Sequence, residues 1–515
     1  MFEQSIVVAL YLPVYAFGGF LALILLNVIQ QRLFRKAGDP PMVLHWLPFI
    51  GNAISYGMDP FSFFLQCRKK HGDVFTFVLF GRKITCCLGT HGNDFVLNSK
   101  HQDVSAEEIY GPLTTPVFGS DVVYDCPNSK LMEQKKFIKF GLTQKALESY
   151  VQKIEGEVTD YIDSSPSLSS HSGMMEICSV MAEITILTAA RALQGDEVRS
   201  KLTAEFAALY HDLDLGFSPV NFLFPWAPLP HNRRRDAAHA KMRAVYMDII
   251  HERRKSGVDV NEGSDMIWNL MRCTYKNGQA VPDKEVAHMM ITLLMAGQHT
   301  SSSASSWIML HLASRPDIAE ELYQEQLENL SVDGVLPPLQ YSDLDKLPLL
   351  NNVVKETLRV HSSTHSLLRK VKNTLQIPGT PYTITPDKVL LASPIVTALS
   401  DEFFPNALVW DPHRWDGKTT GEEPVGDDLV DYGYGAVSKG TKSPYLPFGG
   451  GRHRCIGEKF AYVNLGTIIN TMVRKFKVNT VDGKPTVPAT DYSTLFSRPS
   501  QTAVIRWERR QSERN

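Results

Sequence analysis

The pattern of apolar and polar positions sets one segment near the N-terminus apart from the rest of the chain. Residues 6–29 contain no charged residue, and a helix of that length spans about 36 Å, enough to cross a bilayer core. Basic residues follow it directly at Arg32, Arg35 and Lys36, which favours a retained single-pass anchor with the remaining chain in the cytosol. A cleaved signal peptide is the alternative, but the apolar segment is too long and the basic residues lie on the wrong side of it.

Short strands precede a long region of helical pattern. Residues 73–88 contain the runs VFTFVL and KITCCL, which predict two strands joined by a turn. Residues 93–272 mostly follow the helical period, with breaks expected at Pro112, at Pro116, at Pro127 and in the aromatic, proline-rich stretch 219–230. That stretch is expected either to line a hydrophobic entrance near the membrane or to belong to the core.

The longest helical pattern covers residues 282–316 and has a proline at each end. In its middle, residues 296–303 read AGQHTSSS, where glycine and serial hydroxyls weaken a helix and can hydrogen-bond to its carbonyls. We interpret this stretch as a locally opened helix that holds hydroxyls and an imidazole over a ligand. A polar stripe facing other helices is the alternative.

These elements predict a mainly α fold with smaller β-sheets (α+β) and one large catalytic domain. The expected boundaries are residues 1–36 for the anchor and its basic flank, 37–60 for a proline-containing linker, and 61–515 for the catalytic domain. No internal repeat is visible, and the acidic, glycine-bearing stretch 416–431 indicates a surface insertion.

Composition narrows the function classes. The chain has 515 residues, of which 43% are hydrophobic and 21% are charged, which is typical of a globular protein. Its formal net charge of −2 argues against nucleic acid as the main partner. The seven cysteines are odd in number and contain no CxxC pair, which indicates a reducing compartment and no disulfide framework.

One cysteine stands in a distinctive loop. Residues 447–457 read PFGGGRHRCIG, so that Cys455 follows three glycines, two arginines and His453, and a helical pattern starts at Glu458. A cysteine ahead of a helix N-terminus and beside cations is expected to favour its thiolate form, which is a nucleophile or a metal ligand. A glycine-rich turn with an inert buried cysteine is the alternative.

The spacing F-G-x-G-x-[R/H]-x-C-x-G resembles the heme-binding signature of the cytochrome P-450 superfamily, in which a cysteine thiolate binds the heme iron. Residues 296–301 resemble the oxygen-binding motif [AG]-G-x-x-T-[ST] of that superfamily. Glu356 and Arg359 match its E-x-x-R motif, and Arg414 would complete a buried structural triad. A surface ion pair is the alternative for Glu356 and Arg359, which share a helix face.

Within the superfamily, the chain is similar to the fungal sterol 14α-demethylases. Residues 110–124 resemble their substrate-recognition segment, residues 295–302 have their His-Thr pair, and residues 432–441 with His453 resemble the fungal branch. The resemblance covers essentially the whole chain after the anchor.

The resemblance implies heme b as the cofactor, with Cys455 as the axial ligand of its iron. Thr300 would hydrogen-bond dioxygen, and His299 would stand in a proton path, which suits the near-neutral pKa of histidine. The remaining heme contacts implied are Tyr110, Tyr124, Lys135, Arg369 and His453 for the propionates, with Phe448 and Gly449 in the cysteine loop. The sterol pocket implied is lined by Tyr110, Phe118, Ala296, Gly297, His365, Ser366, Leu367, Leu368 and Leu495.

The implied reaction is three successive oxidations of a sterol 14α-methyl group, released as formate, in ergosterol biosynthesis at the endoplasmic reticulum membrane. Electrons would come from NADPH through a separate flavoprotein reductase, since no GxGxxG nucleotide loop is present. Azole inhibitors are implied as ligands. A basic docking face for the reductase, or a merely solvated charged face, is expected at Lys439, Lys442, Arg452, Arg454 and Lys459.

Three alternatives involve the same residues. A protein of the same fold could oxidise a fatty acid or a xenobiotic, although residues 110–124 argue against this. A cysteine-nucleophile enzyme could use Cys455 with His453, but residues two apart on a turn point in poor mutual directions and no third group is evident. A non-catalytic carrier of sterol or heme would not need the Thr300 hydroxyl or the His299 imidazole.

Overall fold

The computed structural model describes residues 2–33, 36–201, 204–257, 265–417, 429–438, 440–494, 496–500 and 503–510. Leu495, Lys439 and most of the stretch 416–431 lie outside the described residues. The chain divides into two compact units. The first unit contains residues 1–106 and 366–397, and the second contains residues 107–365 and 398–515.

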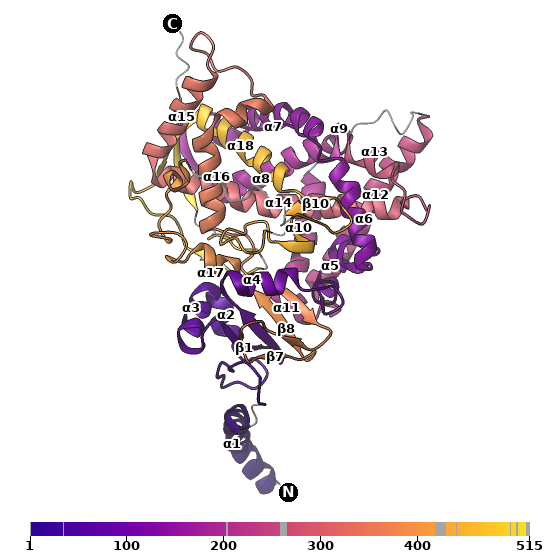
Figure 1. The fold of residues 1–515 in the computed structure, drawn as a ribbon, viewed down its shortest axis with the longest axis vertical. Coiled ribbons are helices and arrows are strands. Elements are labelled where there is room, and N and C mark those ends of the chain that lie inside the picture. Colours follow the sequence, from indigo (N-terminus) through magenta and orange to yellow (C-terminus); the bar gives the residue numbers. More distant parts are fainter. Residues whose placement is uncertain are drawn as a thin grey trace. The chain divides into compact units, whose positions relative to one another are not determined.

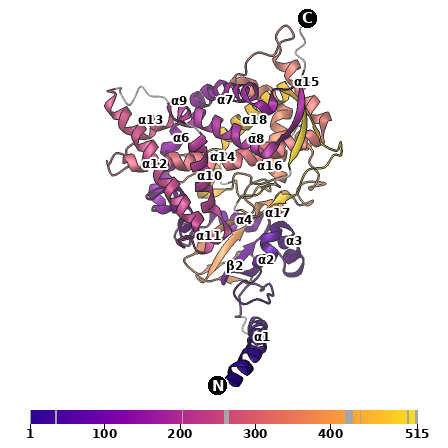
Figure 2. The ribbon, with the colours of Figure 1, turned by 180° about the vertical axis from the view of Figure 1, so that it is seen from behind.

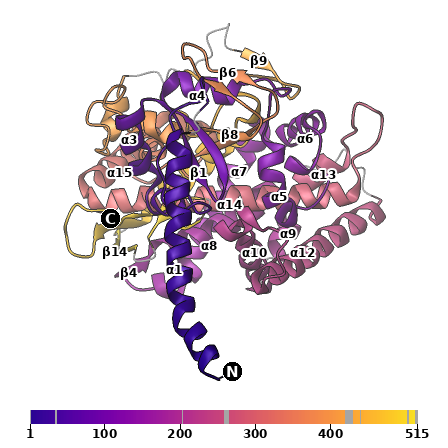
Figure 3. The same cartoon turned by 90° about the horizontal axis from the view of Figure 1, so that it is seen from below.

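The first unit begins with helix α1 (Phe2–Leu33), which includes the charge-free residues 6–29 as one continuous helix (Figure 3). Its last turns are joined to the following segment, because Asn27 Nδ2 donates to the carbonyl of His45 at 2.9 Å and Gln31 Nε2 donates to the same carbonyl at 2.9 Å. By length and composition, Tyr15–Leu33 could cross a membrane and is not buried in the structure. Ile177–Gln194 passes the same test but is mostly buried in the second unit.

A five-stranded sheet organises the rest of the first unit, in the order β1-β2-β8-β5-β3. The two predicted strands are confirmed as an antiparallel pair, and Phe80 and Gly81 between them both have positive φ (46° and 75°), as a tight hairpin turn requires. The strands are β1 (Val74–Leu79), β2 (Arg82–Cys87), β3 (Val104–Ser105), β5 (Leu367–Val371) and β8 (Lys388–Ala392), with the small pair β6 (Leu375–Gln376) and β7 (Thr383–Ile384). The helices are α2 (Ala53–Met58), α3 (Pro60–His71) and α4 (Gly89–Asn98), and α17 (Pro394–Ala398) spans the chain boundary with the second unit.

The second unit is mainly helical (Figure 1). Its helices are α5 (Glu107–Phe118), α6 (Asn128–Phe140), α7 (Gln144–Ser164), α8 (Ile177–Ala189), α9 (Asp196–Ser200), α10 (Ala204–Asp214), α11 (Pro219–Leu223), α12 (Pro230–Lys255), α13 (Met266–Met271), α14 (Asp283–Ser314), α15 (Pro316–Leu330), α16 (Pro348–Val360) and α18 (Glu458–Lys475). Single helical turns of 3₁₀ type are η1 (Val123–Asp125), η2 (Pro166–Leu168), η4 (Leu215–Phe217), η6 (Pro412–Trp415) and η8 (Gly451–His453), with the longer η5 (Tyr341–Lys346) and the π-helical η3 (Ala190–Gln194).

Three small sheets accompany these helices. β11 (Phe476–Thr480), β14 (Val504–Arg509) and β4 (Ser172–Glu176) form one antiparallel sheet. The other two are the pairs β9 (Leu429–Asp431) with β10 (Ala436–Ser438), and β12 (Thr490–Asp491) with β13 (Arg498–Pro499).

Helix α14 is the central element of the second unit, where it packs against α8, α16 and α18 (Figure 2). The helix predicted over residues 282–316 is confirmed within two residues at each end. Most of its side chains are buried, and Trp307, with 1% exposure, is among the largest fully buried side chains.

Two local expectations are wrong. Pro112 and Pro116 lie inside α5 and do not break it; the missing N–H groups are tolerated because Leu113, Val117 and Phe118 are buried against neighbouring elements. Helix α14 is not locally opened at residues 296–303 but continuous. Two of its hydroxyls donate to carbonyls of the preceding turn, Thr300 Oγ1 to Ala296 O at 2.9 Å and Ser302 Oγ to His299 O at 3.2 Å, and such bonds are compatible with an intact helix.

Candidate functional site

The cysteine loop ends on the first turn of α18. Gly449 and Gly451 have φ of 68° and 64°, a region that favours glycine, and the Cys455 N–H donates to the carbonyl of Phe448 at 3.0 Å. The Phe448 ring packs on the core at 5.6 Å from that of Tyr462. Six of the seven cysteines are buried or half-buried, whereas Cys455 is exposed. The loop therefore holds one accessible thiol on a fixed backbone.

The expectation of a low thiol pKa is wrong for the protein alone. Although Cys455 is exposed, the protein atoms around its thiol disfavour the charged form, and this desolvation raises the pKa above the usual value. The Gly457 N–H and the charges of Lys135 and Arg454 oppose this effect without outweighing it, and Glu458 adds to it. The thiolate therefore needs a further positive partner, and a metal ion bound at the sulfur is such a partner.

A buried cation lies beside the loop. Lys135 of α6 donates from Nζ to the carbonyls of Arg452 and Arg454, at 3.0 Å each. Burial lowers the pKa of this lysine to about 7. Among the described residues, no carboxylate lies within ion-pair distance of Lys135. An anionic ligand at this position would remove the cost of burying the charge.

Aromatic side chains continue from this lysine along the predicted propionate contacts. The Tyr110 and Tyr124 rings lie 5.3 Å apart, and the Tyr124 and His453 rings lie 6.0 Å apart. The second unit thus brings Tyr110, Tyr124 and His453 into one row, and Lys135 contacts the loop that carries His453. Arg369 belongs to the first unit, where it is buried and donates to the carbonyl of Leu368 at 2.8 Å.

Helix α14 has one accessible stretch within its buried length. Ala296 is exposed, and Gly297, His299 and Thr300 are half-buried, although residues before and after them are buried. A Cβ atom added to Gly297 would meet no atom within 4 Å outside the helix backbone. A core helix that exposes small and hydroxyl residues in one stretch borders open space, which a bound group can fill.

His299 has a partner that the sequence did not reveal. Its Nε2 lies 3.0 Å from Oδ1 of Asp214, the last residue of α10. Burial raises the pKa of Asp214, but the hydrogen bond and charge of His299, with Arg498 and His211, outweigh it, so the net pKa is lowered. The His299 ring is also stacked on Phe496 at 5.7 Å. The imidazole is therefore held between an acidic group and an aromatic surface.

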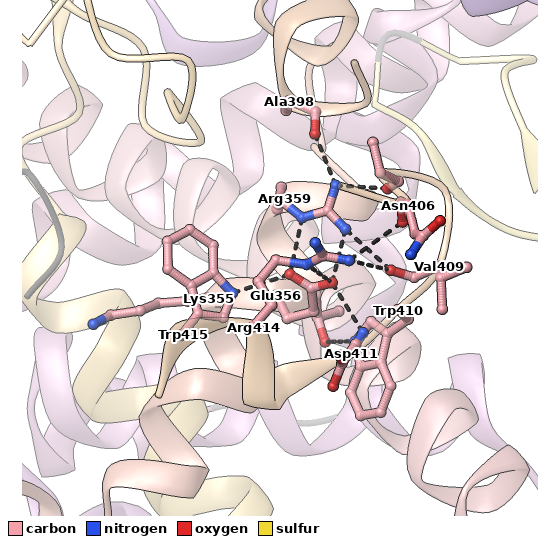
Figure 4. A network of polar contacts seen from close by, with 12 residues as sticks. Lys355, Glu356, Arg359, Ala398, Asn406, Val409, Trp410, Asp411, Arg414 and Trp415 are labelled. Carbon is pink, nitrogen blue, oxygen red and sulfur yellow. Dashed lines mark hydrogen bonds and ion pairs between the residues drawn. The ribbon is translucent and has the colours of Figure 1, made fainter. Parts of the chain in front are cut away.

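The predicted triad forms a buried ion network (Figure 4). Arg359 and Glu356 have no exposed side-chain surface and are paired through two contacts of 2.7 and 2.8 Å. Arg414 Nε donates to Glu356 Oε1 at 3.0 Å. Both arginines also donate to the Val409 carbonyl. The pair is therefore not a surface ion pair but a fully enclosed one, in which two guanidinium groups share the Glu356 carboxylate and also donate to backbone carbonyls.

Further donors to Glu356 come from residues that sequence analysis did not single out. Trp415 Nε1 donates to Oε2 at 3.0 Å, and the Asp411 N–H donates to Oε1 at 2.9 Å. Both follow from the WDPHRW run that supplied Arg414, so the motif contains them once its fold is known. The network fixes residues 405–415 to α16 and leaves no side chain of the triad exposed for chemistry.

The predicted pocket residues are divided between the units. In the second unit, Phe118 is 9% exposed and His365 contacts the Tyr492 ring at 5.8 Å. In the first unit, Ser366 Oγ accepts a hydrogen bond from Tyr56 at 3.0 Å, and Leu367 and Leu368 begin β5. Of the expected docking cations, Arg454 is paired with Glu458 at 2.9 Å and Arg452 lies over the Tyr432 ring, whereas Lys442 and Lys459 are exposed.

Comparison with known proteins identifies the class. Residues 40–507 match the cytochrome P450 family, and the chain belongs to that family. The structure resembles that of the retinoic acid-bound cyanobacterial CYP120A1, with a TM-score of 0.76 at 20% identity over 92% of this chain and 100% of that chain, which bears on the fold. The mainly α fold with small β-sheets is thereby confirmed.

The chain also matches named relatives over nearly its full length. It is 71% identical over 97% of its length to the sterol 14-alpha demethylase CYP51A of Gibberella zeae, of which 98% is covered. It is 67% identical over its whole length to a sterol 14-alpha demethylase of Aspergillus flavus, which is also covered completely. It is 59% identical over 96% of its length to the eburicol 14-alpha-demethylase of Penicillium italicum, of which 96% is covered.

Members of the cytochrome P450 family contain a heme whose iron is bound by a cysteine thiolate, and heme is the cofactor of this chain. The residues of the second unit fit such a group. Cys455 offers an accessible sulfur, Lys135 is a buried cation without a carboxylate partner among the described residues, and α14 borders open space at Gly297. The Cys455 sulfur suits the heme iron, the Lys135 cation suits a propionate, and the space beside Gly297 suits the flat ring.

Proposed function

We propose that the chain removes the 14α-methyl group of a sterol precursor, lanosterol or eburicol, by three successive oxidations that release it as formate in ergosterol biosynthesis. The relatives that support this assignment are matched over nearly their full length and are named sterol or eburicol 14-alpha demethylases. The structural observation that carries it is the accessible stretch at residues 296–300 of α14, in a unit that also holds the accessible Cys455 thiol.

Cys455 is the proposed ligand of the heme iron. The bound heme supplies dioxygen activation, helped by electron density from the thiolate. Lys135, Tyr110, Tyr124 and His453 would hold the propionates from the second unit, since phenol and cationic donors suit carboxylates. Arg369 is the propionate donor proposed from the first unit, and Phe448 and Gly449 shape the loop on which the sulfur stands.

Thr300 and His299 are the proposed catalytic residues. The Thr300 hydroxyl donates to Ala296 O, and rotation of its side chain would turn the donor toward a ligand in the adjacent space. The His299 Nε2 lies 3.0 Å from the Asp214 carboxylate. A histidine beside a carboxylate at the surface of the site can pass protons inward and recover them from Asp214.

The sterol would lie against apolar and small residues. Ala296 and Gly297 leave room beside α14, and Phe118 offers an aromatic surface at the end of α5. The other proposed contacts are Tyr110, His365, Ser366, Leu367, Leu368 and Leu495. The same pocket would accept azole inhibitors. A long, mostly apolar pocket with few polar groups suits a sterol.

Its partners follow from the same assignment. A flavoprotein reductase would deliver NADPH electrons, with Lys442 and Lys459 as exposed cations for docking. Helix α1 would anchor the chain to the endoplasmic reticulum membrane in a single pass, with the catalytic part in the cytosol. The proposed boundaries are residues 1–36 for the anchor, 37–60 for the linker and 61–515 for the heme domain.

Ligand-binding spectra test the substrate class. Lanosterol and eburicol should each produce a substrate-induced spin shift of the heme, and a long-chain fatty acid at the same concentration should not. In a Thr300→Ala variant, the sterol shift should persist while product formation falls. A shift with the fatty acid and none with either sterol would favour another substrate for the same fold.

A further inference from the structure

The C-terminal end of helix α5 lies beside two histidines from other helices. The helix ends at Phe118, and Gly119 leaves it with φ of 99°. Carbonyl groups in the last turn of a helix have no donor within that helix. Here His239 of α12 bonds to the carbonyl of Phe118 in that last turn, and His288 of α14 bonds to the carbonyl of Ser120, two residues beyond the helix.

Each histidine bonds to one carbonyl. His288 Nδ1 lies 2.9 Å from the carbonyl oxygen of Ser120, and the His239 ring bonds to the carbonyl of Phe118. A carbonyl only accepts hydrogen bonds, so each ring nitrogen that faces one must carry the proton. Neither Nε2 has a hydrogen-bond partner among the described residues, which leaves the carbonyl bond to determine the tautomer of both rings.

Both rings are held in the neutral form. Burial lowers the pKa of His239 to about 4, helped by the charges of His288 and Arg243, while Phe118 and Asp236 oppose the shift. Burial also lowers the pKa of His288. The two rings lie 5.2 Å apart between centroids. Each therefore has one N–H to donate at neutral pH, and donates it to a carbonyl at the end of α5 or just beyond it.

Gly119 makes the close approach possible. A Cβ atom at this position would lie 2.4 Å from the His288 ring, and its backbone has a conformation that other residues rarely adopt. Glycine is required here for both reasons. The absence of a side chain at Gly119 thus allows the His288 imidazole to pack directly against the backbone after α5.

The capped end leads directly to the proposed catalytic residues. The Phe118 ring lies 5.8 Å from that of Phe217, and Phe217 lies 6.5 Å from His299. A displacement of the Phe118 carbonyl moves the Phe118 side chain, because both belong to one residue at a helix end. Contacts of this kind transmit small shifts because the interior is close-packed.

We propose that His239 and His288 form a clasp on the end of α5 that sets the position of Phe118 for sterol binding. Both are positioning residues, and their link to sterol affinity rests on the proposed function. The clasp acts through two N–H groups that donate to backbone carbonyls. A different side chain that keeps the N–H donor should therefore replace each histidine.

The test compares variants that keep or remove the donor, in the full-length holoenzyme with its reductase. His288→Asn retains an N–H near the place of Nδ1, and His288→Leu removes it at similar volume. His288→Leu should raise the Kd and KM for sterol about 5-fold, the loss expected for one hydrogen bond, with kcat within about 2-fold. His288→Asn should stay within about 2-fold of the parent in all three. His239→Asn and His239→Leu should repeat the pattern, and His251→Leu, an exposed histidine of α12, should change nothing.

Amide hydrogen exchange of residues 117–122 gives a readout without sterol. Exchange should rise in both Leu variants and not in the Asn variants, while the reduced carbon monoxide spectrum keeps its thiolate band. The proposal would be overturned if the Leu variants had the same sterol Kd, sterol KM and amide exchange as the parent. It would also be overturned if the Asn variants were as impaired as the Leu variants. If the parent failed to bind sterol, the proposed function would fail, and the exchange result would still decide the clasp.

Discussion

The Asp214 carboxylate lies 3.0 Å from Nε2 of His299, although the two residues are 85 positions apart and on different helices. The carboxylate lies at the end of α10, and the imidazole lies in the accessible stretch of α14. The lowered pKa of Asp214 keeps its carboxylate ionised at neutral pH. Asp214 can therefore accept a proton and extends the proposed proton path beyond His299.

Replacing Asp214 by Asn should therefore slow turnover without weakening sterol binding. We expect kcat to fall at least about 10-fold, since positioned proton transfer commonly contributes that much or more, while the sterol Kd stays within about 2-fold. Asp212→Asn, on the same helix and 3.8 Å from Arg234, is the matched control and should retain parental turnover. A parental kcat in the Asp214 variant would remove this residue from the path.

Removing the charge of Glu356 should destabilise the protein strongly. Glu356→Gln leaves Arg359 and Arg414 buried without their carboxylate, and breaking such a pair costs about 3–5 kcal/mol. Urea unfolding of the full-length protein in detergent measures the loss. The exposed pair of Arg315 with Asp317 provides the control, because Asp317→Asn should cost less than about 1 kcal/mol. Equal losses in the two variants would contradict a structural role special to the triad.

Acid should weaken the fold through His311. Burial lowers the pKa of this residue to about 3, and its Nε2 lies 2.8 Å from that of His361, whose pKa is also lowered, by burial and by the charges of His311 and Arg359. As pH falls below about 6.5, the unfolded chain binds a proton that the folded chain excludes until about pH 3. Stability is therefore lost across that interval, by roughly 2 kcal/mol for this residue between about pH 6.5 and 4.5.

The His311→Gln variant checks this assignment. Its amide nitrogen can still donate to His361 but does not titrate, so the free energy of unfolding should fall less steeply with acid than in the parent. Urea unfolding at about pH 6.5, 5.5 and 4.5 compares the two slopes. Identical slopes would mean that other groups account for the acid sensitivity.

Replacing Cys455 by Ser tests the iron ligand. The variant should lose the thiolate band of the reduced carbon monoxide spectrum together with all turnover, because a hydroxyl does not supply the thiolate sulfur. Cys178→Ser is the control, since that half-buried cysteine lies on α8 and should leave the spectrum unchanged. A Cys455→Ser protein that still showed the thiolate band would falsify the ligand assignment.

Local patterns in the sequence predicted much of this fold. The strands on either side of Phe80 and the long helix α14 follow from periodicity and from proline positions, which act within a few residues. The cysteine loop and the triad were predicted from motifs, whose spacing is itself local. Resemblance to a family added the sterol, the heme contacts and the partners.

Other features depend on the tertiary structure and could not be read locally. The prolines of α5 are tolerated because its apolar side is buried, and desolvation of the thiol reverses the expected pKa shift of Cys455. Asp214 and the two histidines that cap α5 gain their roles only when separate helices meet. No periodicity or spacing signals such contacts, since ordinary Asp and His residues occur throughout the chain.

Reconstitution tests the central claim most directly. The full-length protein, a flavoprotein reductase and NADPH in lipid vesicles would receive lanosterol and eburicol in competition, with sterol and formate analysis by mass spectrometry. We predict a 14-demethylated sterol and one formate for each sterol consumed. Sterol binding with no demethylated product, or hydroxylation at another carbon without formate, would contradict the account.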